Sequence, residues 1–171
     1  MPDHYYTQTP TSAHKPGQVD FLWRGAKLVF ETDSGVFSRT EIDKGTEILL
    51  NALPEELTGS LLDMGCGYGV IGVTLGRRYP GLSVVMSDVN ERAVELSRRN
   101  AQRNGVPARV MQSDGYADVP FQRMDWIVQN PPIRAGKSVI YAMFAEGARR
   151  LEPSGELWLV IRKQQGAESA V

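Results

Sequence analysis

From residue 60 onward, short apolar runs alternate with segments whose apolar residues recur at helical spacing, and this alternation constrains the fold more than any other feature. Strands are expected at residues 60–64, 82–86, 108–112, 125–129 and 156–162, and helices at 70–78, 90–104 and 138–151. Strands that alternate with helices pair in parallel through right-handed crossovers. The pattern therefore predicts an α/β fold built on a doubly wound, mostly parallel sheet.

The segment before this alternation has a different character. Residues 1–18 are rich in proline, threonine and histidine without an apolar period, so we expect a flexible N-terminal arm followed by one domain over residues 19–171. Residues 19–30 surround the Arg24-Gly25 pair with β-prone runs, which predicts a hairpin or an edge pair. Apolar spacing over residues 40–53 predicts a helix that Pro54 ends.

Length and charge set limits on function. A chain of 171 residues suits one domain with a substantial core. Its net charge of −1 excludes a broadly basic nucleic-acid binder but leaves room for a local basic patch. The single cysteine, Cys66, excludes an internal disulfide and argues against a metal-ligand cluster. Because the sequence has no apolar run of membrane-spanning length, we expect a soluble cytoplasmic protein.

The loop after the expected strand 60–64 is rich in glycine, with Gly65, Gly67 and Gly69 following Asp63. Ligands of doubly wound sheets bind at the carboxyl ends of the strands, and glycines let the backbone approach them closely. A plain turn and a nicotinamide-binding loop are the alternatives. Asp63 at the strand end favours S-adenosylmethionine, because it can accept a hydrogen bond from the amino-acid end of that cofactor or from an intervening water. The tight spacing also suits a ligand without a pyrophosphate.

Acidic residues also follow the next strands. Asp88, beside Val89, can accept both hydroxyls of a cofactor ribose, and Asp114 can accept the amino group of an adenine for which Gly115 leaves room. Taken singly, each acid is more often a turn residue or a helix cap. Acids at the ends of successive strands together predict a binding site for an adenosine cofactor.

The turn Asn130-Pro131-Pro132 follows the expected strand 125–129. Two prolines suit a rigid structural turn. The same rigidity could aim the Asn130 side-chain oxygen and the Pro131 carbonyl at an exocyclic amine, whose lone pair is delocalised into the base. Acceptors that hold the amine hydrogens favour the geometry that frees this lone pair, so catalysis would rest on positioning and preorganisation. On this interpretation Asn130→Asp, which keeps an acceptor, should retain measurable activity.

Together these motifs resemble those of the class I amino-methyltransferases. Phe37-Ser38 and Asp43-Lys44-Gly45-Thr46 upstream, and the run from Ile133 to Lys137 downstream, narrow the resemblance to the small-domain methyltransferase family. Members of this family include bacterial 16S ribosomal RNA guanine-N2 methyltransferases. The resemblance implies a Rossmann-like methyltransferase fold, S-adenosylmethionine as donor, and guanine N2 of ribosomal RNA as acceptor. It also implies that Phe37 and Thr46 lie over the cofactor.

The substrate side is expected beside the Asn-Pro-Pro turn. Arg134 and Lys137 flank it and are the candidates for RNA phosphate contacts. Related enzymes often carry an aromatic residue after the prolines to stack on a flipped base, whereas Ile133 offers only apolar contact, so Phe37 or Tyr141 would supply the stacking unless the target base is already unpaired. The fold of the family continues with two strands after residues 163–166; either the sequence continues beyond Val171, or the sheet has an uncovered edge.

Three other functions stay open. A protein glutamine N-methyltransferase would use the same Asn-Pro-Pro chemistry on a side-chain amide. A nicotinamide oxidoreductase is disfavoured by Asp63 and by Asn-Pro-Pro. A non-catalytic module that binds cofactor or RNA would not require the intact Asn130 and glycine loop that this sequence carries.

Overall fold

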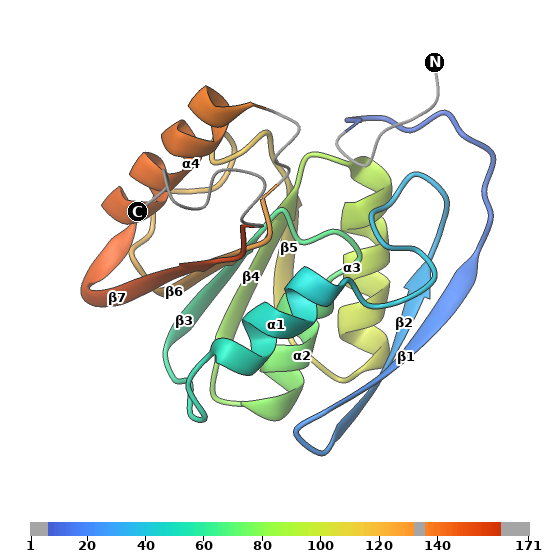
Figure 1. Cartoon of the computed structure of the whole chain (residues 1–171), viewed down its shortest axis with the longest axis horizontal. Coiled ribbons are helices and arrows are strands. Elements are labelled where there is room, and N and C mark those ends of the chain that lie inside the picture. The colour runs from blue at the N-terminus through green and yellow to red at the C-terminus, as the bar shows by residue number, and fades with distance from the viewer. Residues whose placement is uncertain (1–6, 132–135, 162–171) are drawn as a thin grey trace.

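The computed structural model describes residues 7–131 and 136–161 and shows a five-stranded sheet with helices on both faces (Figure 1). The strand order is β5-β4-β3-β6-β7, and every neighbouring pair is parallel. The strands are β3 (Ser60–Met64), β4 (Ser83–Asp88), β5 (Ala108–Gln112), β6 (Met124–Gln129) and β7 (Leu151–Leu159).

 Within the described residues β5 and β7 are the outer strands of this sheet, and the architecture confirms the predicted fold class.

The helices divide between the two faces of the sheet. Alternate residues of β3 show this: Leu61 belongs to the larger core under α1, α2 and α3, whereas Leu62 belongs to the smaller core under α4. Both side chains are almost completely buried, as expected for parallel strands that are covered on both sides. The helices are α1 (Lys44–Ala52), α2 (Val70–Arg78), α3 (Glu91–Arg103) and α4 (Lys137–Arg149). No helix within the described residues is both long enough and apolar enough to cross a membrane.

The direction of winding reverses at the centre of the sheet. From β3 the chain moves outward through β4 to β5, and it then returns to the opposite side of β3 to form β6 and β7. The loops that leave β3 and β6 therefore run toward opposite faces, although the two strands are hydrogen-bonded neighbours. This divergence opens a crevice at the carboxyl ends of the central strands, where ligands of such sheets bind.

A separate antiparallel hairpin, β1 (Gly17–Trp23) and β2 (Ala26–Thr32), packs beside α2 and α3 and confirms the hairpin expected over residues 19–30 (Figure 1). The free edge of β2 is paired by side chains of α3. The amide of Asn104 donates to the backbone oxygen of Val29 and accepts from its nitrogen, and Asn100 does the same with Glu31. These contacts satisfy backbone groups that an edge strand would otherwise leave unpaired.

Two expectations for the N-terminal part need correction. Strand β1 begins at Gly17, within the expected arm of residues 1–18, and residues 7–16 of that arm contact the domain: Gln8 O accepts from Glu91 N at 3.0 Å, and Arg92 donates to Ser12 O at 3.0 Å. The helix expected over residues 40–53 begins only at Lys44. Asp43 has an extended backbone and accepts a hydrogen bond from Thr46 N, so it caps the helix instead of belonging to it.

The last strand also differs from the expected range of 156–162. It begins at Leu151, which had been assigned to the preceding helix, and its pairing with β6 shifts in register between Met124 and Trp126. Gly155 makes this irregularity possible, because a Cβ there would lie 2.7 Å from the carbonyl oxygen of Met124. Pro153 is compatible with the strand because β7 lies at the edge of the sheet that the described residues form.

Candidate active site

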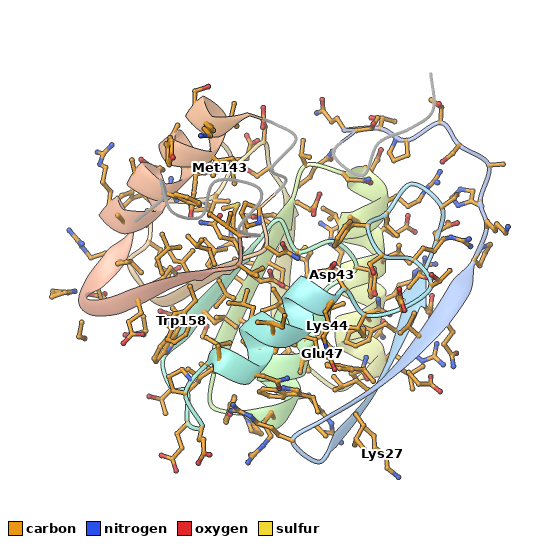
Figure 2. The ribbon with its side chains drawn as sticks, in the orientation of Figure 1. Lys27, Asp43, Lys44, Glu47, Met143 and Trp158 are labelled. Atoms are coloured by element: carbon orange, nitrogen blue, oxygen red, sulfur yellow. The ribbon has the colours of Figure 1, made fainter. Side chains whose placement is uncertain are left out.

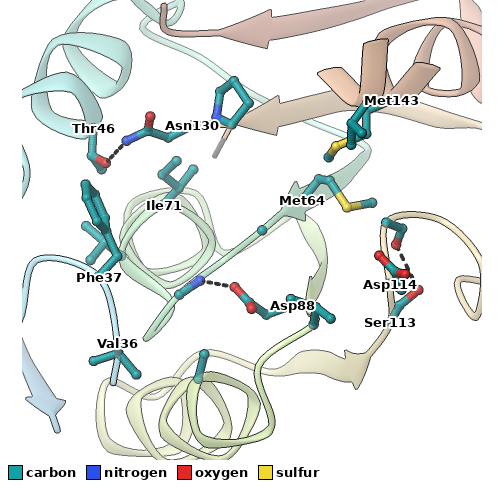
Figure 3. Close-up of a pocket in the computed structure, with 18 residues that line it drawn as sticks. Val36, Phe37, Thr46, Met64, Ile71, Asp88, Ser113, Asp114, Asn130 and Met143 are labelled. Atoms are coloured by element: carbon teal, nitrogen blue, oxygen red, sulfur yellow. Dashed lines mark hydrogen bonds between the residues drawn. The ribbon is translucent and has the colours of Figure 1, made fainter. Parts of the chain in front are cut away.

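A cavity of about 350 Å³ lies at the carboxyl ends of the central strands (Figure 3). It is bordered by the segment before α1 and by the loops after β3, β4, β5 and β6. The residues predicted from the sequence that line it are Phe37, Thr46, Gly65, Gly67, Asp88, Val89, Asp114, Gly115, Asn130 and Pro131. The fold thus brings the separate motifs to one place.

The glycine loop after β3 exposes backbone to this cavity. Gly65 and Gly67 have φ angles of 70° and 56°, and a Cβ on either would meet no atom of the described residues within 4 Å. The backbone nitrogens of Gly65 and Cys66 both donate to Ser87 O at 2.9 Å, which fixes the loop to β4. A ligand can therefore approach the main chain of this loop closely.

Gly69 does not line the cavity, although it was predicted to bind the cofactor. It precedes α2 as the cap residue with a φ of 95°, and a Cβ there would lie 3.1 Å from Ser97 Oγ. Its role is to turn the chain into the helix in a conformation that favours glycine. Cys66, earlier in the same loop, is buried, and burial raises the pKa of its thiol, so the thiol stays protonated.

Asp88 lies at the end of β4 and holds two backbone amides. Its Oδ2 accepts from Gly67 N at 2.8 Å, and its Oδ1 accepts from Asn90 N at 2.9 Å. Burial raises the pKa of Asp88 to about 6, and these hydrogen bonds oppose the rise. The side chain is therefore mostly ionised at pH 7, and each carboxylate oxygen keeps a lone pair for a ligand hydroxyl.

Asp63, at the end of β3, is buried behind the cavity wall. It is only 1% exposed and does not line the cavity. Its Oδ2 accepts from Gly72 N at 2.8 Å, while its buried Oδ1 has no hydrogen-bond partner among the described residues. Burial raises the pKa of Asp63 to about 7, the Gly72 hydrogen bond opposes this, and the charge of Asp88 adds to it. A buried carboxylate oxygen without a partner is expected to accept a hydrogen bond from a bound water or an ammonium group.

The loop after β5 forms another wall of the cavity. Ser113 N donates to Asp88 O at 2.9 Å, and Ser113 Oγ donates to Gly115 O at 2.8 Å, so the loop is held against the end of β4. Asp114 is exposed at the cavity, as predicted, and Gly115 has a φ of 54° with open space where a Cβ would be. The arrangement leaves room for a flat ring beside a carboxylate.

The segment that carries Phe37 is anchored to the loops across the cavity. Tyr68 Oη donates to Ser38 O at 3.1 Å, and Asn90 Nδ2 donates to Gly35 O at 2.8 Å. Phe37 lines the cavity and remains 42% exposed, so it stands at the entrance. Val139 on α4 also lines the cavity and is 48% exposed, which makes the entrance partly apolar.

Asn130 follows β6 and is held through its amide nitrogen. Nδ2 donates to Asp43 Oδ2 at 3.0 Å and to Thr46 Oγ1 at 3.0 Å; Figure 3 shows the second contact. A carboxylate only accepts hydrogen bonds, so the nitrogen of the amide must face it. Oδ1 is thereby left as the acceptor atom of this cavity-lining side chain, and buried Pro131 follows it.

The remaining predicted residues are not part of the described cavity wall. Pro132, Ile133 and Arg134 lie outside the described residues. Lys137 is exposed at the start of α4 and does not line the cavity. The predicted phosphate contacts of Arg134 and Lys137 therefore stay predictions.

Comparison with known proteins decides the family. Residues 27–171 match the model of the family described as methyltransferase small domain. The chain belongs to this family. The small-domain methyltransferase is 45% identical to the Bacillus subtilis protein named "Uncharacterized protein YbxB", and the match covers 100% of the chain and 87% of that protein.

Two further relatives carry more informative names. The small-domain methyltransferase is 42% identical to the ribosomal RNA small subunit methyltransferase C of Hahella chejuensis, over 92% of its own length and 49% of that protein. The solved T. thermophilus 16S rRNA N2 G1207 methyltransferase, in complex with AdoMet and guanosine, superposes with a TM-score of 0.75 at 30% identity. That match covers 86% of the chain and 42% of the solved protein, so the chain spans about half the length of these two relatives or less.

The family is one of S-adenosylmethionine-dependent methyltransferases, and the residues of the cavity fit that cofactor. Asp88 offers acceptors for ribose hydroxyls, and the backbone at Gly65 and Gly67 is open to a ligand. The unpaired Oδ1 of Asp63 fits a buried water that bridges it to an amino group of the cofactor, because the buried Asp63 side chain does not itself line the cavity. Direct contact with the cofactor was the other possibility expected for Asp63.

The sequence did not single out the apolar wall of the small-domain methyltransferase site. This wall consists of Val36, Val70, Ile71, Ala93, Val139 and Met143, beside Met64, whose position near a strand end had allowed either a pocket or a packing role; Ser113 also lines the cavity. Apolar residues at these positions have the spacing of ordinary core residues, so periodicity could not separate them from the core. Adjacency to Asp114 was the only signal for Ser113, whereas Met143 on α4 had none.

Proposed function

We propose that this small-domain methyltransferase transfers a methyl group from S-adenosylmethionine to the N2 amine of guanine in ribosomal RNA. The names of its relatives support this substrate, and the T. thermophilus relative is described with guanosine bound.

One observation carries the chemistry: Asn130 lines the cavity, and Asp43 and Thr46 occupy its amide nitrogen, which leaves Oδ1 as the acceptor atom of this side chain. When bound, S-adenosylmethionine supplies an electrophilic methyl group on a sulfonium. Asn130 Oδ1 and the Pro131 carbonyl would hold the hydrogens of the acceptor amine and favour the geometry that frees its lone pair. Rate acceleration then comes from orientation and from preorganised acceptors, and no strong base is required before transfer.

The same acceptors could hold the amide of a protein glutamine, which is the nearest alternative. We would incubate the purified protein with radiolabelled S-adenosylmethionine and either ribosomal subunits or a release-factor-like protein. Label that appears in ribosomal RNA and is identified by nucleoside mass spectrometry as N2-methylguanosine supports the proposal. Label in the protein alone would replace it with the glutamine alternative, and cofactor binding without transfer to any acceptor would favour the non-catalytic module.

Asn130→Ala tests the role of the turn within that assay. Turnover should fall roughly a hundredfold, by analogy with the loss of one preorganised polar contact in other active sites. Affinity for S-adenosylmethionine should change little, because other residues provide the contacts with the cofactor. An alanine variant with normal turnover would remove Asn130 from the chemistry, and one that no longer folds would make the turn structural.

A further inference from the structure

We propose that Asp43 and Thr46 are positioning residues for Asn130: they hold its amide with Oδ1 available to the acceptor amine, and the charge of Asp43 strengthens that oxygen as an acceptor. The inference concerns the amine that the proposed function methylates, so it rests on that function. It brings Asp43, the cap residue of α1, into the site, and it gives Thr46, which the family resemblance placed over the cofactor, a contact with Asn130.

The contacts of Asp43 show that its carboxylate has two tasks. Asp43 Oδ2 accepts from Thr46 N at 2.9 Å, which caps α1, and the same oxygen accepts from Asn130 Nδ2 at 3.0 Å. Figure 2 shows Asp43 at the start of α1, with Lys44 and Glu47 on the same turn. A cap alone would require only the first of these contacts.

Gly45 provides the room that this arrangement needs. A Cβ at Gly45 would lie 2.9 Å from Asp43 Oδ2, so a larger residue would push the carboxylate away from its partners. Gly45 has no φ in the left-handed region, and its absence of a side chain is therefore explained by space and not by backbone conformation.

The helix that carries these residues is fixed to the core. Leu49 and Leu50 of α1 are 3% and 0% exposed, and Thr46 is 6% exposed. Because α1 cannot shift without disturbing buried side chains, Asp43 and Thr46 present acceptors at constant positions. Asn130 consequently loses little freedom when a substrate binds, since its amide already has one orientation.

The charge of Asp43 acts on Oδ1 through the amide. A hydrogen bond from an amide nitrogen to a carboxylate is charge-assisted, and polarisation along it increases the negative charge on the amide oxygen. An oxygen with more negative charge holds amine hydrogens more strongly and stabilises the positive charge that the amine gains during transfer. Asp43 therefore influences the acceptor amine without touching it.

The same geometry reverses the sequence-based expectation for Asn130→Asp. The substitution would place a second carboxylate where Nδ2 lies 3.0 Å from Asp43 Oδ2. Like charges at this distance repel, so the new side chain would be displaced or would retain a proton. The structure thus explains why an amide, and not merely an acceptor, stands at this position.

The test compares Asp43→Asn with Glu47→Gln, a matched carboxylate-to-amide change on the same helix. Glu47 pairs only with exposed Lys44 in the described residues and is not part of the site. Asparagine caps helices as well as aspartate does, so Asp43→Asn should fold normally. The kcat of Asp43→Asn on ribosomal subunits should fall about tenfold. This is the lower end of the loss of activity that follows when a residue that orients a metal ligand through a hydrogen bond is replaced. Cofactor affinity should be unchanged, and Glu47→Gln should match the wild type.

A double-mutant cycle separates positioning from a structural effect. If Asp43 acts through Asn130, Asp43→Asn should lower kcat in the wild-type background and have no further effect in the Asn130→Ala background. Thr46→Val should lower kcat in the same way, and Thr46→Ser should retain more activity because it keeps the hydroxyl. Normal kcat of Asp43→Asn, or an equal loss in both backgrounds, would overturn the inference.

A second measurement does not depend on the substrate. Side-chain amide signals of Asn130 in ¹⁵N-resolved NMR spectra should shift in Asp43→Asn and Thr46→Val but not in Glu47→Gln. If the wild type transfers no methyl group to RNA, the proposed function fails, and these shifts still decide whether Asp43 and Thr46 hold the Asn130 amide. Unchanged Asn130 signals in both variants would overturn the positioning role.

Discussion

Asp88 accepts a hydrogen bond from Gly67 N at 2.8 Å, so the acid at the end of β4 holds the glycine loop that follows β3. One carboxylate thus shapes the backbone of the glycine loop and also lines the cavity. Loss of Asp88 should therefore affect affinity and loop structure together, and the two effects need variants that separate them.

Asp88→Ala should weaken S-adenosylmethionine binding by about 1.5–3 kcal/mol for each charged hydrogen bond that is lost. Asp88→Asn keeps one oxygen that can accept from Gly67 N, and it should bind the cofactor more tightly than the alanine variant does. Isothermal titration calorimetry measures both affinities. Unchanged affinity in both variants would remove Asp88 from the cofactor site.

Gly65→Ala should weaken cofactor binding beyond its effect on folding. The added Cβ meets no protein atom within 4 Å and borders the cavity, while the φ of 70° costs about 1–2 kcal/mol for a residue with a side chain. Gly105→Ala is the matched control, because Gly105 has a φ of 68° with similar open space but lies outside the cavity. Denaturant unfolding should show similar losses of stability, and calorimetry should show weaker binding only for Gly65→Ala.

Asp63 should make the cofactor-free protein less stable as the pH rises. Its pKa is about 7 in the folded protein and near the ordinary 3.8 when unfolded. Between these values the unfolded chain has released the proton that the folded protein keeps, so the free energy of unfolding falls as the pH increases from about 4 to about 7. Asp88, with a pKa of about 6, contributes in the same direction.

Asp63→Asn should remove the larger part of this dependence. Urea unfolding at pH 5, 6, 7 and 8 should show the variant gaining stability relative to the wild type as the pH rises, and the remaining slope belongs to Asp88. The variant should also bind S-adenosylmethionine more weakly at pH 8, since a neutral amide replaces the carboxylate. A wild-type stability that rises between pH 5 and 7 would contradict the raised pKa of Asp63.

Arg134 and Lys137 should contact RNA phosphates and leave the cofactor alone. Replacement of both by alanine should raise the KM for RNA and reduce the slope of log affinity against log salt by about one per lost phosphate contact. Lys27→Ala is the control, because Lys27 lies at the hairpin turn, away from the cavity (Figure 2). If the double variant keeps the wild-type salt slope, the RNA is bound elsewhere on the protein.

Regular elements were predicted well where the determining contacts are local. The bounds of β3, α2 and β5 agree with the sequence-based ranges, because apolar runs and the glycines and prolines beside them lie within a few residues of each other. The start of α1 was wrong by several residues, because the side chain of Asp43 decides it by capping at Thr46. The start of β7 depends on pairing with β6, a contact that periodicity does not contain.

The sequence by itself determined the fold class, the order of the motifs and the chemistry that each motif can perform, since turns, glycines and strand-end acids are local properties of the chain. Only the tertiary structure decided which of these groups meet. Asp43 and Asn130 are 87 residues apart and share a hydrogen bond, and Asp63 is buried behind the cavity that Asp88 lines. The physical reason is that such contacts and burial arise when helices pack on the sheet, and local spacing carries no record of that packing.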